Sequence, residues 1–189
     1  GFSLYDEGVR DGHFLRLPND VLVTAPVWPG DCVFPDFTQA KTRQWWGEQY
    51  RGLVDAGVAG FWHDMNEPAA FVSWGEPTLP RVTEHDMDGY SGAHVEGHNV
   101  YALLEAQAAY QSLRRLHPER RPLIISRAGW VGLQRYAWTW TGDTESTWKT
   151  LRQTIPTVLG LGLSGIPYSG PDIGGYAGAP SRAAGRSTR

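Results

Sequence analysis

The chain alternates short apolar runs with longer segments in which apolar residues recur at helical spacing. Runs typical of strands occupy residues 21–28, 58–62, 123–126, 136–141 and 165–172. Segments with a helical period lie among them at residues 38–56, 99–117 and 148–159. Because no hairpin signal separates the strands, this order predicts crossover connections and a parallel sheet of five strands.

Individual residues indicate where these elements end. Thr38 is expected to cap the start of the first helix, and Gly57 suits the position just after its end. Pro118 is expected to stop the second helix, and Pro156 to bend the third. Residues 70–97 are rich in glycine, proline, acids and histidines, and are expected to form a long insert of loops.

Polar or aromatic side chains follow the carboxyl ends of several expected strands. They are Trp28, Asp31, Asp64, Arg127, Asp143 and Asp172. Convergence of reactive groups from several strand ends is typical of a (β/α)₈ TIM barrel. A dinucleotide-binding sheet would use mainly the turn after its first strand. The pattern therefore favours a barrel.

Composition narrows the class of protein. Hydrophobic residues make up 41% and charged residues 20% of the 189 residues, which predicts a globular enzyme. A net charge of −3 does not indicate a surface that binds nucleic acid. No apolar run is long enough to span a membrane. A single cysteine excludes an internal disulfide framework. Nine tryptophans are an unusual number, and part of this set is expected to line a ligand surface.

Two acidic segments framed by tryptophan carry the strongest chemical signal. The sequence FWHDMNEP at residues 61–68 places Asp64 and Glu67 just after an expected strand, and WTWTGD at residues 138–143 places Asp143 after another. Tryptophan faces stack on sugar rings, and two opposed carboxyl groups cleave glycosidic bonds. Either acid alone is better interpreted as a cap that satisfies backbone N–H groups. Together the two segments favour a sugar-cleaving site.

The chain resembles glycoside hydrolase family 31, a family of retaining α-glucosidases and their relatives. Matching segments occur in family order over roughly residues 20–178: VWPG, FPDF, WHDMNEP, SRAG, QRY, WTGD and GPDIGG. The resemblance implies a partial (β/α)₈ TIM barrel over residues 1–178, with about strands 3 to 7 present. Residues 179–189 are small and basic and are expected to be a disordered tail outside the family pattern. The family's first two strands, the sugar-binding acid they carry and a later histidine have no counterpart.

The resemblance also assigns roles. It implies Asp64 as the nucleophile and Asp143 as the acid/base, a choice between Asp64 and Glu67 that spacing cannot make. Glu67 is expected to lie behind the reacting residues and to orient the end of the strand. The residues implied to hold the sugar or wall its subsite are Trp28, Trp62, Met65, Arg127, Trp140, Asp172 and Tyr176. A structural salt bridge is the alternative role for Arg127, and a strand residue facing the helices is the expected role for His63.

The expected activity is hydrolysis of terminal α-linked glucosyl residues with retention, on an oligosaccharide or α-glucoside. Transglycosylation or lyase chemistry on the same site, and a non-catalytic carbohydrate-binding fragment, are the alternatives. No cofactor is implied, and the His94/His98 pair lacks the order of a zinc motif and encloses Gly97, so no metal is expected. No signal peptide is evident, which favours the cytoplasm, and the sequence does not indicate an oligomeric state.

Overall fold

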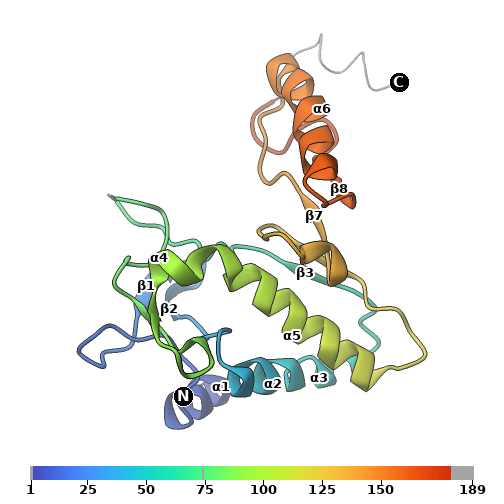
Figure 1. The fold of residues 1–189 in the computed structure, drawn as a ribbon. Helices are drawn as coiled ribbons and strands as arrows, with labels where there is room; N and C mark the ends of the chain where they lie inside the picture. The colour runs from blue at the N-terminus through green and yellow to red at the C-terminus, as the bar shows by residue number, and fades with distance from the viewer. Residues whose placement is uncertain (1, 74, 180–189) are drawn as a thin grey trace.

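A four-stranded parallel sheet forms the centre of the structure, a computed structural model that describes residues 2–73 and 75–179 (Figure 1). Its strands lie in the order β3–β6–β7–β8. Their bounds are β3 Phe61–His63, β6 Ile124–Ser126, β7 Trp138–Trp140 and β8 Ser169–Gly170. The predicted parallel sheet is confirmed, and it brings the carboxyl ends of these strands to one edge.

The helices lie close to where the hydrophobic period predicts them. The longer ones are α1 Ser3–Arg10, α2 Ala40–Glu48, α3 Arg51–Asp55, α5 Tyr101–Leu116 and α6 Trp148–Leu163. Helix α5 ends at Leu116, two residues before Pro118, as expected. Gly57 follows the end of α3 with a φ of 95°, the left-handed conformation that glycine adopts easily. Thr38 is not the cap: α2 begins after Gln39, and the Thr38 hydroxyl donates to Asp36 instead.

Helices α2 and α5 pack against each other beneath the sheet (Figure 1). They approach closely at Gly47, where an added Cβ would lie only 2.4 Å from the Ser112 hydroxyl. Trp45 is buried beside His13, and Trp46 packs against both apolar clusters of the core, as expected for residues on an inward helix face. The two helices therefore form the base on which β3 and β6 rest.

The expected strand at residues 21–28 does not join the parallel sheet. Strand β1 (Thr24–Val27) instead pairs antiparallel with β2 (Gly30–Val33), so the expectation of no hairpin and of five parallel strands is wrong. The turn consists of Trp28 and Pro29, and Gly30 closes it with a φ of 107°. A glycine tolerates this φ, whereas other residues would be strained there.

The insert contains a second small hairpin and several short helical turns. They are β4 Glu84–His85, η1 Met87–Gly89, β5 Gly92–Ala93, α4 His94–Gly97 and η2 His98–Val100, with η3 Leu133–Arg135 later in the chain. Strands β4 and β5 pair antiparallel. The insert leads directly into α5, so it lies next to the amino-terminal end of that helix (Figure 1).

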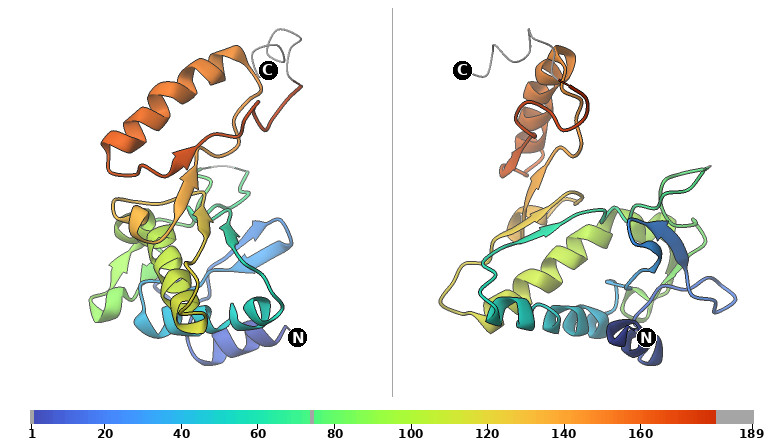
Figure 2. Two further views of the ribbon diagram at one scale, coloured as in Figure 1. Left: turned by 90° about the vertical axis from the view of Figure 1, so that its right-hand side faces the viewer. Right: turned by 180° about the vertical axis from the view of Figure 1, so that it is seen from behind.

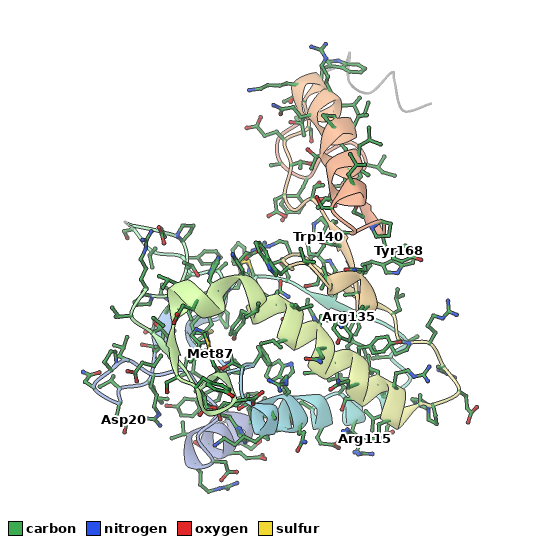
Figure 3. The ribbon with its side chains drawn as sticks, viewed as in Figure 1. Asp20, Met87, Arg115, Arg135, Trp140 and Tyr168 are labelled. Atoms are coloured by element: carbon green, nitrogen blue, oxygen red, sulfur yellow. The ribbon has the colours of Figure 1, made fainter. Side chains whose placement is uncertain are left out.

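Helix α6 projects away from the body of the molecule, to which it is joined through β7 and β8 (Figures 1 and 2). No residue of α6 is buried, and its apolar side chains Ile155, Leu159 and Leu163 are exposed. Trp140 and Tyr168 lie where this part joins the body (Figure 3), and the Tyr168 ring stacks on Trp138 at 5.6 Å. Of the described helices, none is both long and apolar enough to cross a membrane. The tail is expected at residues 179–189, of which residues 180–189 lie outside the described residues.

Candidate active site

The segment that follows β3 carries Asp64, Met65 and Glu67 across the sheet edge. Its backbone is unusual, because Met65 has a φ of 61° without being glycine. Such conformations persist only where surrounding contacts hold them, and they concentrate at functional sites. Contacts with the surrounding structure therefore hold this turn in its unusual conformation.

Asn66 supplies the contacts that hold the turn. Its buried side chain donates to Glu105 Oε2 at 2.9 Å and to Ser126 Oγ at 2.8 Å, and it accepts from the Ala128 N–H at 3.1 Å. Ser126 Oγ in turn donates to the Ala128 carbonyl at 2.7 Å. The network fastens the end of β3 to the end of β6 and to α5, so Asp64 and Arg127 are kept side by side.

Arg127 lies among the acids of the site. Its Nε and Nη2 donate to the two Glu67 carboxylate oxygens at 2.7 and 2.8 Å, and its Nη1 lies 3.0 Å from Asp64 Oδ1. Its Nη2 also lies 3.0 Å from Met65 Sδ. The hydrogen bonds to Glu67 raise the pKa of Arg127 most, and the charges of Asp64 and Asp143 raise it further. The single positive charge of the guanidinium is thus shared between the Glu67 and Asp64 carboxylates.

The two carboxylates beside Arg127 are held differently. Glu67 receives a bidentate pair of hydrogen bonds, a fixed geometry typical of a structural acid. Within residues 2–73 and 75–179, the Asp64 carboxylate accepts no hydrogen bond, and its Oδ1 is buried. Asp64 is therefore held by its ion pair with Arg127 and not by hydrogen bonds, and its role as nucleophile stays a prediction.

Asp143 lies across a cleft from this cluster. Two adjoining hollows, of about 620 and 760 Å³, share Glu67, His98, Asn99, Arg127 and Asp143 in their walls. Trp140 lines the first hollow and packs on Trp62, with ring centroids 4.9 Å apart. The turn after β3 lines this cleft through Met65 and Glu67, and the segment at the end of β7 lines it through Trp140 and Asp143, whereas Asp64 is not among the residues of either wall.

The remaining predicted sugar-binding residues are less closely gathered. Trp28 is 75% exposed and lines the second hollow with Met65, and its ring meets Phe71 edge-on at 4.7 Å. Asp172 lines a separate hollow of about 220 Å³ between the start of α6 and the segment after β8. Tyr176 is 68% exposed and is held by its backbone N–H, which donates to the Thr144 carbonyl. Asp172 and Tyr176 are therefore not brought to the cleft, and their roles stay predictions.

Sequence reasoning missed the residues that support the site. One signal was available for Glu105, because it is an acid on the apolar face of α5, flanked by Tyr101 and Ala109 at helical spacing. Burial raises the pKa of Glu105, although the nearby His63 and the hydrogen bond from Asn66 oppose that rise. His63 faces the helices as expected, with Nε2 2.9 Å from the Tyr50 hydroxyl.

The described part of the chain contains no group of three or more histidine, cysteine or acidic side chains arranged to hold a metal ion. The cationic group within the site is Arg127, which forms ion pairs with Asp64 and Glu67. The chemistry that this arrangement can perform is transfer of a proton and attack by a carboxylate on a substrate in the cleft.

Comparison with known proteins identifies the family. Residues 1–186 match the family model described as "Glycosyl hydrolases family 31 TIM-barrel domain". The chain belongs to glycosyl hydrolase family 31. The resemblance read from the sequence and the barrel fold class are both confirmed.

Relatives within family 31 agree on the class of protein. The chain is 42% identical to "Alpha-glucosidase 2" of Bacillus thermoamyloliquefaciens over 93% of its length, and 36% identical to "Alpha-glucosidase" of Saccharolobus solfataricus over 88%. It spans only 22% and 27% of the length of these two relatives. Among solved structures, the glucosidase II alpha subunit matches 97% of the chain with a TM-score of 0.88 and 28% identity, over 20% of that subunit.

Proposed function

We propose that the protein is an α-glucosidase-type hydrolase that cleaves terminal α-linked glucosyl residues with retention of configuration. The observation that carries the proposal is the contrast between the acids around Arg127. Glu67 is fixed by two hydrogen bonds, Asp64 is left without any within the described residues, and Asp143 lies in the wall of the same cleft. One free carboxylate and one across a cleft are the pair that a retaining mechanism uses.

The reaction proceeds as a double displacement. Asp143, protonated, donates its proton to the leaving oxygen while the Asp64 carboxylate attacks the anomeric carbon and forms a glycosyl ester. Asp143, now ionised, takes a proton from water, which attacks the same carbon, and Asp64 leaves. Each step inverts the anomeric centre, so the product keeps the α configuration. This geometry requires the two carboxyl groups to lie about 5–5.5 Å apart when substrate is bound.

Other groups around the cleft have supporting roles in this proposal. Arg127 lies 3.0 Å from Asp64 Oδ1 and places a positive charge beside the attacking carboxylate. Trp140 and Trp62 offer an aromatic surface for the apolar face of a sugar ring. A glucosyl substrate is supported by relatives, since a family 31 dextranase of Flavobacterium johnsoniae is described in complex with glucose and shares 31% identity with the chain.

Substrates with different leaving groups test the roles directly. In the full-length protein, Asp143→Ala should lower kcat/KM for an alkyl α-glucoside by several hundredfold, but only slightly for an aryl glucoside with a good leaving group. Good leaving groups need no proton, whereas poor ones do. Asp55→Ala, on an exposed helix end, is the matched control and should change neither value. Equal losses for both substrates would contradict the acid/base role.

Product analysis tests the reaction class. Proton NMR of the first sugar released should show the α-anomer, which mutarotates to the equilibrium mixture afterwards. Appearance of the β-anomer first would contradict retention, and an unsaturated sugar would indicate elimination instead of hydrolysis.

A further inference from the structure

A row of three histidines connects a buried acid with the active-site cleft. His85 Nε2 lies 2.9 Å from His94 Nδ1, and His94 Nε2 lies 3.1 Å from His98 Nδ1. At the inner end, His85 Nδ1 faces Asp36 Oδ1 at 3.6 Å. At the outer end, His98 lines both hollows of the cleft together with Arg127. The contacts between side-chain nitrogens therefore run from His85 to the site, and Asp36 lies just beyond hydrogen-bond distance of their inner end.

The inner part of the row is firmly held. His85 and His94 are only 1% and 2% exposed, and their rings stack at 5.2 Å. Burial alone would raise the pKa of Asp36, but the hydrogen bonds from His85, Thr38 and their neighbours lower it overall. The Asp36 carboxylate therefore places a negative charge beside His85 Nδ1.

The protonation of His94 follows from its surroundings. Burial, followed by the charges of His85 and His98, lowers the pKa of His94 to about 4, so its ring is neutral and has one N–H. The Thr78 hydroxyl donates to the Pro68 carbonyl at 2.6 Å, and its oxygen lies 3.3 Å from His94 Nε2. Because that hydroxyl proton is already used, the oxygen can only accept from His94. The His94 proton therefore sits on Nε2, and Nδ1 accepts from the His85 Nε2–H.

This arrangement determines what His98 presents to the cleft. The His94 Nε2–H points between Thr78 and His98 Nδ1, so His98 Nδ1 is an acceptor and the proton of a neutral His98 lies on Nε2. Within the described residues, His98 Nε2 has no hydrogen-bond partner. Glu76 is an acid on the insert, and its carboxylate accepts hydrogen bonds from Arg81. The His98 Nε2–H is thus a donor available to a ligand in the cleft.

We propose that His98 is a substrate-binding residue whose Nε2–H donates to a hydroxyl oxygen of the sugar, and that His85 and His94 are positioning residues that fix its tautomer. This inference rests on the proposed function in that the ligand is a sugar. A fixed tautomer matters because the wrong one would present a lone pair instead of a donor, and a site built for one hydrogen-bond pattern rejects others strongly.

Nitrogen NMR of the full-length protein, labelled at histidine, tests the tautomer without relying on catalysis. His98 should appear as the Nε2–H form, and its signal should shift when maltose is added. In His85→Phe, which keeps a ring of similar size but removes the donor, His94 is freed to reverse its proton and His98 should become a mixture of tautomers. His117→Gln, at the far end of α5, is the control and should leave the His98 signal unchanged. An Nδ1–H form of His98, or no shift with maltose, would overturn the inference.

Kinetics give a second measurement. His98→Phe should raise KM for maltose about tenfold with a smaller change in kcat, because one hydrogen bond to bound substrate is lost. His98→Gln retains an N–H donor and should recover most of that loss, which a purely structural role for the ring would not do. Unchanged KM in both variants, with circular dichroism spectra like wild type, would overturn the inference and leave the proposed function standing. A wild-type protein without α-glucosidase activity would contradict the proposed function, whereas the maltose titration by NMR would still decide the role of His98.

Discussion

Replacing Asn66 by alanine should loosen the turn that carries Asp64. The side chain is 5% exposed and makes three hydrogen bonds, to Glu105, Ser126 and the Ala128 N–H. A net contribution of about 1 kcal/mol for each bond gives a loss of about 3 kcal/mol. The loss is local, because all three bonds join the end of β3 to β6 and α5.

Amide hydrogen exchange measures this loss where it occurs. The Arg127 N–H donates to the His63 carbonyl at 3.0 Å, a bond that the substitution leaves intact, so its exchange reports opening of the two strand ends. A loss of about 3 kcal/mol corresponds to about a hundredfold lower protection at this amide. Asn19→Ala, in an exposed turn, is the matched control and should change protection by less than about 0.5 kcal/mol.

The same substitution should also lower activity. Misplacement of a reacting group by about 1 Å costs on the order of a hundredfold in rate, so kcat for α-glucosides should fall by about that factor. Protection at Arg127 within a factor of two of wild type would refute the reasoning, because Asn66 would then not hold the two strand ends together.

Two further predictions concern the helices beneath the sheet. Gly47→Ala should destabilise the protein by about 1–3 kcal/mol in urea denaturation, since its Cβ would lie 2.4 Å from Ser112 Oγ. Gly52→Ala has no atom within 4 Å of the new Cβ and should be neutral or stabilising by up to about 1 kcal/mol; equal effects would contradict the close packing of α2 and α5. Because burial raises the pKa of Glu105 in the folded state, its ionisation opposes folding, so stability should fall as the pH rises from 4.5, its ordinary pKa, through the raised value. Glu105→Gln should remove that part of the pH dependence, and an unchanged pH profile would show that Glu105 does not titrate in this range.

The periodic part of the fold could be predicted from the sequence because local patterns specify it. The apolar run at Ile124–Ser126 and the helical spacing over α5 needed no information from elsewhere in the chain. The hairpin β1–β2 was missed because Trp28 and Pro29 form an uncommon two-residue turn and because Gly30–Val33 lacks the alternation of a strand. Its pairing is decided by a partner strand rather than by its own pattern.

In the candidate site, too, local features could be predicted from the sequence and long-range contacts could not. The acids and tryptophans could be selected because their residue types carry the chemistry. The contacts of Asn66, Glu105 and Ser126 could not, because they join residues up to 60 positions apart and depend on how α5 packs against the sheet. The hydrogen bonds between Arg127 and Glu67 could not be predicted either, because they too depend on which residues the fold brings close together.

Covalent labelling of the nucleophile tests the central claim most directly. The full-length protein would be treated with a fluorinated α-glucosyl fluoride, whose glycosyl ester forms quickly and hydrolyses slowly, and then digested for peptide mass spectrometry. We predict one added sugar on Asp64 and loss of labelling in Asp64→Ala. A sugar on Glu67, or undiminished labelling of the Asp64→Ala variant, would contradict the assignment of Asp64 as the nucleophile.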